Sequence, residues 1–118
     1  MKSIKLFGIL FFSIFSFQFS FAQTVKTETI AVNGNCGMCK KNIEKSALAA
    51  GATTASWDKK TKFLNISYDP AISNSVKIQT AVAAAGYDTQ DFKASDSAYN
   101  KLDECCQYER KNDKEKKE

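Results

Sequence analysis

The chain has 118 residues, of which 43% are hydrophobic and 25% are charged, and its formal net charge is +4. This length fits one small domain, and so small a positive charge does not indicate a nucleic-acid-binding protein. The sequence contains four cysteines and no histidine. Zinc sites that use imidazole and Cys–His nucleophile pairs are therefore excluded, whereas soft-metal thiolate chemistry stays open.

Residues 1–22 have the pattern of a secretory signal peptide. A short basic start with Lys2 and Lys5 precedes an uncharged, Phe-rich run at residues 6–22, which ends in a small-x-small motif. The alternative is an uncleaved anchor, but the run is short for a membrane span and no stop-transfer flank follows it. We therefore expect cleavage after Ala22, no stable membrane insertion afterwards, and a periplasmic or otherwise exported protein. Loss of the two lysines lowers the net charge to +2.

The first two elements frame a C-x-x-C motif. Residues 24–32 are rich in β-branched side chains and predict a strand. Residues 39–50 are helix formers, with Ile43, Ala47 and Ala50 at helical spacing. Cys36 should thus lie in the connecting loop and Cys39 in the first helical turn, where free N–H groups and the helix dipole favour thiolate. Such a pair can be a metal clip, a redox couple or a structural disulfide.

Two further strands and a second helix follow. Residues 52–57 and 62–68 predict a hairpin, and residues 87–93 a weak fourth strand. Between them, Ser73 or Ser75 is expected to cap a helix with an apolar face. The resulting order predicts an α+β fold, a ferredoxin-like βαββαβ sandwich. Three aromatic residues are expected in the core or on a strand face: Trp57, Phe63 and Tyr68.

The C-terminal part extends beyond this domain, which we place at residues 23–94. Residues 95–108 predict one short extra helix, and residues 109–118 form a charged run that we expect to be disordered. The fourth strand, of about six residues, would carry the chain ~20 Å away from the C-x-x-C loop, and a helix of about ten residues spans ~15 Å. A tail helix that folds back could therefore bring Cys105 and Cys106 near the first cysteine pair, as extra metal ligands or as disulfide partners. The alternative is a pair unrelated to the loop; a disulfide between the two adjacent residues would be strained.

Several segments together resemble the heavy-metal-associated domain of copper chaperones and periplasmic mercury-binding proteins. The matching segments, spread over residues 24–93, are the strand–loop–helix around Gly34-Asn-Cys-Gly-Met-Cys39, then Gly51-Ala52, Ile66-Ser-Tyr-Asp-Pro70 and Ala85-Gly-Tyr87. The family loop commonly has Met and Thr in the two places before the first cysteine. Here those places hold Gly34 and Asn35, and a methionine, Met38, falls between the cysteines.

The resemblance implies a non-enzymatic carrier of a soft metal ion, with Cys36 and Cys39 as thiolate ligands. It favours Cu(I), in line with thiolate softness, while Hg(II), Zn(II) and Cd(II) stay open. It places Tyr87 beside the metal, where it would shield the site or contact a ligating cysteine. Met38 is a candidate thioether ligand, or else packs or is exposed.

The resemblance also suggests a partner, a metal-transport or efflux protein with its own cysteine metal site. The protein itself would be a monomer or a metal-bridged dimer. Basic residues gather on the helix after the loop and are candidates for docking an acidic partner, although such runs are commonly solvated faces. These residues are Lys40, Lys41 and Lys45.

Two other functions use the same cysteines. A thiol–disulfide oxidoreductase would suit the helix-start position of Cys36 and Cys39 and an oxidising compartment. However, no thioredoxin-like core with a cis-proline segment is recognisable, and Pro70 is the sole proline. The third interpretation is a secreted binding module stapled by two disulfides.

Overall fold

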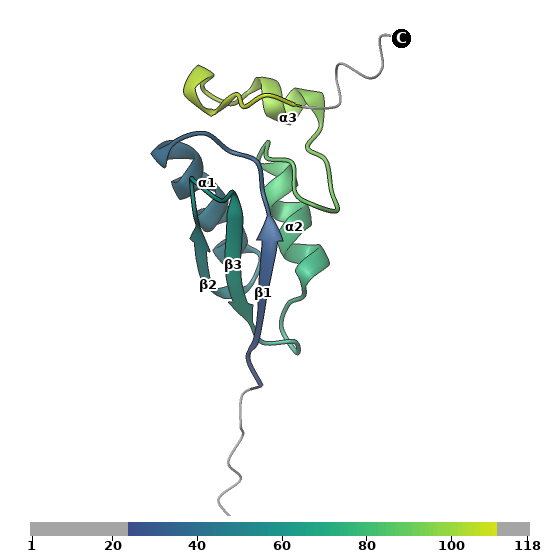
Figure 1. The fold of residues 1–118 in the computed structure, drawn as a ribbon. Coiled ribbons are helices and arrows are strands. Elements are labelled where there is room, and N and C mark those ends of the chain that lie inside the picture. Colours follow the sequence, from purple (N-terminus) through teal and green to yellow (C-terminus); the bar gives the residue numbers. More distant parts are fainter. Residues whose placement is uncertain (1–23, 111–118) are drawn as a thin grey trace, which may run out of the picture.

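The computed structural model describes residues 24–110; the expected signal peptide and residues 111–118 lie outside this part of the chain. An antiparallel sheet is covered on one face by two helices, and a C-terminal segment lies across one end (Figure 1). The elements are β1 (Lys26–Ala31), α1 (Gly37–Ala49), β2 (Ala52–Trp57), β3 (Phe63–Tyr68), α2 (Ser75–Ala84), α3 (Asp96–Asn100) and the 3₁₀ helix η2 (Glu104–Cys106). Within residues 24–110, no helix is both long enough and apolar enough to cross a membrane. The predicted α+β, ferredoxin-like fold is confirmed.

The sheet has the strand order β1-β3-β2, and its side chains alternate between the core and the open face. In β3, Leu64, Ile66 and Tyr68 are buried, whereas Phe63 is exposed on the open face. Trp57, at the end of β2, is also buried. The hairpin of β2 and β3 therefore supplies much of the core beneath the helices.

Helix α1 buries Ile43 and Ala47, as the helical spacing predicts. The expected caps of the second helix are wrong. Asn74 is the N-cap of α2, and its side chain accepts a hydrogen bond from the Lys77 N–H at 2.8 Å. Ser73 is instead buried against the end of α1, where its hydroxyl donates to the Ala50 carbonyl at 2.7 Å.

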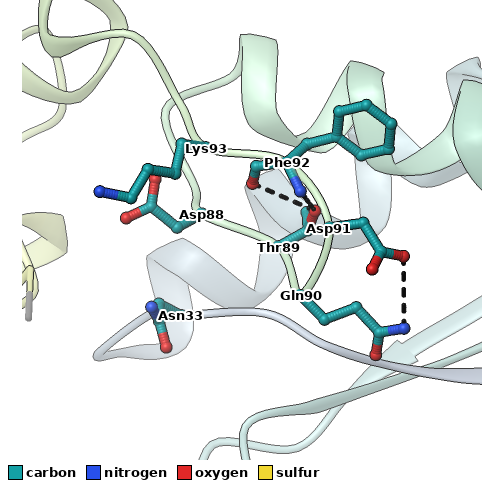
Figure 2. Close-up of a pocket in the computed structure, with 7 residues that line it drawn as sticks. All are labelled: Asn33, Asp88, Thr89, Gln90, Asp91, Phe92 and Lys93. Carbon is teal, nitrogen blue, oxygen red and sulfur yellow. Dashed lines mark hydrogen bonds between the residues drawn. The ribbon is translucent and has the colours of Figure 1, made fainter. Parts of the chain in front are cut away.

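The fourth strand expected at residues 87–93 does not form, and only an isolated bridge between Val32 and Thr89 takes its place. After this bridge the Thr89 N–H donates to the Phe92 carbonyl, which reverses the chain. Polar side chains drive this change because they offer the backbone other partners than a strand ladder. The Gln90 side chain, for example, accepts the Ala31 N–H, and the Thr89 hydroxyl donates to Gln79. The resulting turn, with Asn33, lines a polar pocket (Figure 2).

Because the chain reverses here, the C-terminal segment stays at the end of the sheet that carries the loop before α1 (Figure 1). This segment contains two short helices, α3 and η2, rather than the single helix predicted. The break falls at residues 101–103, between Asn100 and the η2 N-cap Asp103, two residue types that favour caps and turns over helix interiors. We call residues 95–110 the tail.

The tail is anchored on the domain through its last residues. The Tyr108 hydroxyl donates to the Gly86 carbonyl at 2.9 Å and accepts the Asp88 N–H at 2.8 Å. Arg110 forms a salt bridge with Asp88 at 2.8 Å, and both side chains are at least nine-tenths buried. The expectation of disorder from residue 109 onward is therefore wrong for Arg110, because its charge is paired with a residue distant in the sequence.

Gly86 makes this docking possible. It has a positive φ of 111°, and an added Cβ would lie 2.9 Å from the Ala98 carbonyl oxygen and from the Leu102 side chain. A residue with a side chain would be strained at this φ and would push the tail away.

Candidate metal centre

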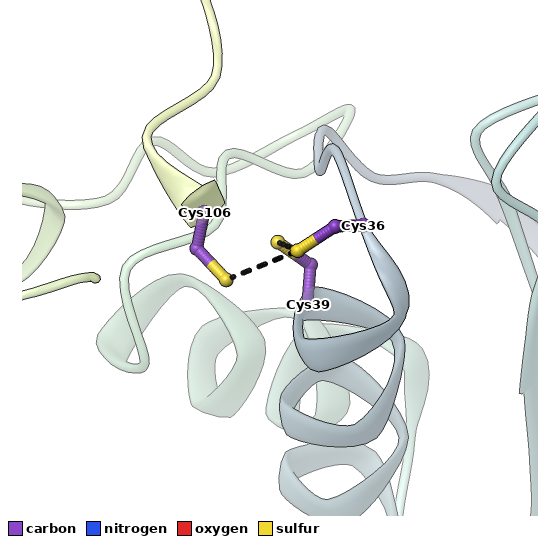
Figure 3. A group of neighbouring side chains, drawn as sticks. All are labelled: Cys36, Cys39 and Cys106. Carbon is purple, nitrogen blue, oxygen red and sulfur yellow. Dashed lines mark hydrogen bonds between the residues drawn. The ribbon is translucent and has the colours of Figure 1, made fainter. Parts of the chain in front are cut away.

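The first two sulfur atoms are positioned by the start of α1. Cys36 is the N-cap residue, with extended backbone angles, and its carbonyl accepts the first helical hydrogen bond, from the Lys40 N–H at 3.0 Å. Cys39 is the third residue of the helix and is fully buried. The two Sγ atoms lie 3.5 Å apart (Figure 3). A cap and the residue three places on share one side of a helix start, so the motif points both thiols at one spot.

The loop before Cys36 is held close to Trp57. A Cβ at Gly34 would lie 3.0 Å from the Trp57 ring and 3.2 Å from Ile43, so this position has no room for a side chain. The Trp57 indole N–H donates to the Val32 carbonyl at 2.9 Å, and the Lys62 ammonium donates to the Gly34 carbonyl. Gly34 stands at a position where the family loop commonly has methionine. The close packing against Trp57 and Ile43 explains why this position holds glycine.

The tail places a third sulfur atom at the same spot. Cys106 Sγ lies 3.7 Å from Cys36 Sγ, although the two residues are 70 positions apart in the sequence (Figure 3). The sulfur atoms of Cys36, Cys39 and Cys106 all lie within 4.8 Å of one another. Cys105 is exposed, and its sulfur lies 4.0 Å from that of Cys106. All four cysteines are free thiols.

The three thiols of this cluster differ in their electrostatics. The backbone N–H of Cys39 interacts with the Cys36 sulfur and lowers the pKa of Cys36 to about 6, against the opposing effect of desolvation. Burial, together with the neighbouring sulfurs, raises the pKa of Cys106. The interaction with Cys36 likewise raises the pKa of Cys105. The start of α1 therefore favours thiolate at Cys36, whereas burial favours the neutral thiol at Cys106.

Tyr87 lies beside this cluster, in the loop where the resemblance places it. It is fully buried, and its hydroxyl accepts a hydrogen bond from the Asn42 side chain at 3.1 Å. Burial raises its pKa, and the hydroxyl also interacts with Cys106. Its ring stacks on Tyr108, with 6.3 Å between the ring centroids. Tyr87 thus contacts a cysteine of the cluster and also the tail that carries it.

The other candidate site residues lie at the surface around the loop. Met38 is 46% exposed and does not belong to the core. Lys40 is engaged within the domain, because its ammonium donates to the Trp57 carbonyl at 2.8 Å and pairs with Glu44 at 2.6 Å. Lys41 and Lys45 are exposed and are therefore free to face a partner.

The structure resembles solved metal-binding proteins. It matches "CopZ metallochaperone" at 26% identity with a TM-score of 0.52, covering 54% of this chain and 98% of that one. It matches oxidized MerP from Ralstonia metallidurans CH34 at 25% identity with a TM-score of 0.53, covering 56% of this chain and 94% of that one. A putative copper-ion-binding protein from Bacillus anthracis str. Ames matches in fold at 23% identity, with a TM-score of 0.54 and coverages of 58% and 99%. No protein-family model and no curated protein matches the sequence.

These likenesses show that just over half of this chain adopts the fold of heavy-metal-associated domains. One of these neighbours is named a metallochaperone, in agreement with the prediction of a non-enzymatic protein. Each alignment covers 94% or more of the neighbour, and it covers just over half of this chain.

Proposed function

We propose that this protein is an exported carrier or store of a soft metal ion, with Cu(I) as the preferred ion and Cys36 and Cys39 as its thiolate ligands. One observation carries the proposal: the two sulfur atoms lie 3.5 Å apart at the start of α1 in a fold shared with a metallochaperone. Thiolates select soft ions, and the depressed pKa of Cys36 supplies one thiolate at neutral pH.

The same arrangement suits transfer of the ion. Cys36 is partly exposed, whereas Cys39 is buried. An incoming thiolate of a partner can therefore attack the ion from the Cys36 side and displace one ligand at a time. The partner we propose is a metal-transport or efflux protein with a cysteine site, approached over the exposed Lys41 and Lys45. Export rests on the signal-like pattern of residues 1–22.

The test is an anaerobic titration of the reduced protein, purified after expression of the full chain, with Cu(I) against a competing chelator. We expect tight one-to-one binding, and its loss in Cys36→Ser/Cys39→Ser. Parallel titrations with Hg(II), Zn(II) and Cd(II) rank the ions. Intact mass of the purified protein reports cleavage after Ala22, and an uncleaved chain would contradict export.

A thiol–disulfide oxidoreductase is the second candidate, because a depressed thiol pKa also activates a cysteine for disulfide exchange. The titration separates the two functions. A reduced protein that fails to compete for Cu(I) but reduces a disulfide substrate would favour the redox function.

A further inference from the structure

We propose that the tail completes the metal site: Cys106 is a third thiolate ligand, so the ion is held by three sulfurs of one chain. This inference rests on the proposed function, because it concerns the ion that Cys36 and Cys39 bind. It adds a ligand from outside the C-x-x-C motif, and it restricts the ions that the site accepts.

The sulfur separations support three ligands rather than two. With a metal–sulfur bond of about 2.3 Å, two thiolates in linear coordination lie ~4.6 Å apart, and three in a trigonal plane lie ~4.0 Å apart. In the structure the separations from Cys36 are 3.5 Å to Cys39 and 3.7 Å to Cys106. A linear ion would have to spread the first pair by about an ångström, whereas both separations from Cys36 lie within about 0.5 Å of the trigonal value.

The tail buries Cys106 at this spot and leaves Cys105 exposed at its edge. The Cys106 N–H donates to the Asp103 carbonyl at 2.7 Å, which closes the 3₁₀ turn that carries both residues. Cys106 is 1% exposed, while its neighbour Cys105 is exposed to solvent. Two adjacent cysteines therefore have different surroundings, and Cys105 provides a matched control for Cys106.

The anchor that follows Cys106 holds it in place without an ion. Tyr108 is bound between Gly86 and Asp88, and Arg110 forms hydrogen bonds to both Asp88 oxygens at 2.8 and 3.0 Å. The Arg110 guanidinium also donates to the Ala94 carbonyl at 2.6 Å. These contacts lie two and four residues beyond the cysteine. A ligand already held near its bound position loses little freedom when the ion arrives, and this strengthens binding.

Three converging sulfurs define the class of ion. A soft d¹⁰ ion that accepts three thiolates, such as Cu(I) or Hg(II), fills this site without a further ligand. A tetrahedral ion such as Zn(II) needs a fourth ligand. The described residues that cluster here supply three ligand atoms, because the Cys105 sulfur lies outside the group. We therefore expect trigonal soft ions to be preferred over Zn(II).

The experiment is X-ray absorption spectroscopy of the Cu(I)-loaded protein at the copper edge, with chelator competition in parallel. We expect three sulfur neighbours in the wild type and in Cys105→Ser, and two in Cys106→Ser. The affinity of Cys106→Ser should fall at least as much as the roughly 10- to 100-fold caused by removing a supporting residue of a metal site. Cys105→Ser should keep the wild-type affinity.

Two outcomes would overturn this inference, and they differ from failure of the proposed function. Two sulfurs in the wild type, or a Cys106→Ser affinity equal to that of Cys105→Ser, would leave a two-cysteine carrier and an incidental tail. Absence of Cu(I) binding by the wild type would remove both proposals. Cys106→Ala is a second variant in case serine disturbs the buried position, and circular dichroism of each variant checks its fold.

Discussion

The two cysteine pairs of this chain differ in sequence spacing, and therefore in whether both sulfurs of the pair point to the same place. Cys36 and Cys39 are three residues apart at a helix start, so one helical turn brings both sulfurs to the same place. Cys105 and Cys106 are adjacent, so the 3₁₀ turn buries one and exposes the other. Spacing thus decides where each pair points, but only the complete fold decides whether the pairs meet. The following predictions test this difference, beginning with the largest expected effect.

The first prediction removes the contact that holds the second pair against the first. Arg110→Ala leaves the buried Asp88 carboxylate without its partner, and breaking a buried pair in this way costs about 3 kcal/mol or more. We expect a lower melting temperature and faster hydrogen exchange in the tail. Lys101→Ala, an exposed change in the same segment, should have no measurable effect. Equal stability of the two variants would show that the tail is not anchored through Arg110.

The second prediction concerns the accessibility of the four thiols in the reduced, metal-free protein at neutral pH. Cys36 should react fastest with an alkylating reagent, and Cys105, which is accessible but has a raised pKa, more slowly. Cys39 and Cys106 should be protected by about 100-fold or more, because they react only when the structure opens locally. Mass spectrometry of the labelled peptides measures the order. Equal rates at Cys105 and Cys106 would contradict the inward position of Cys106.

The third prediction is a pH profile for alkylation of Cys36. Its pKa lies at about 6, below the ordinary value of 9.0, so thiolate increases as the pH rises through 6. Because the thiolate is the reactive form, the rate should rise about tenfold between pH 5 and pH 7 and then level off. Cys105, whose pKa is raised, should still gain reactivity well above neutral pH. A Cys36 profile that rises only near pH 9 would contradict activation by the helix start.

The smallest expected effects on stability come from a matched pair of glycines around Cys36. Gly34→Ala places a methyl group 3.0 Å from the Trp57 ring and should cost about 1–3 kcal/mol, since overpacking strains a filled core. Gly37→Ala meets nothing within 4 Å and should stabilise the first turn of α1 by up to about 1 kcal/mol. Thermal or denaturant unfolding measures both changes. A Gly34→Ala variant as stable as the wild type, or more stable, would show that the loop is not packed on Trp57.

Local patterns predicted the elements that depend on their own residues. The strand at residues 52–57 was predicted to the residue, and Ile43 and Ala47 lie in the core as their spacing indicated. Cys36 lies just before the helix, as the strand and helix patterns predicted, and Tyr87 lies in the loop that the family resemblance assigned to it. In each case the signal lies within about ten residues, where periodicity and turn chemistry are readable.

Elements that depend on distant partners were not predictable in this way. The polar stretch after Tyr87 reads as a weak strand until its partners, among them the Gln79 side chain, are known. The charged run from residue 109 onward has a composition typical of disorder, and only the fold shows that Asp88 pairs with Arg110. The route of the tail also differs from the one expected, because the chain reverses at residues 89–92 instead of completing a strand and folding back.

The 70 positions between Cys36 and Cys106 have a consequence for chain entropy. An ion held by Cys36 and Cys39 alone closes a loop of three residues, whereas an ion held by Cys36 and Cys106 ties together most of the described chain. In the unfolded state the longer loop costs about 3 kcal/mol more to close, by the logarithmic dependence on loop length. A single ion would thus act on this small domain as a reversible cross-link. The loaded protein should then resist heat and proteases to a degree that a C-x-x-C clip alone does not provide.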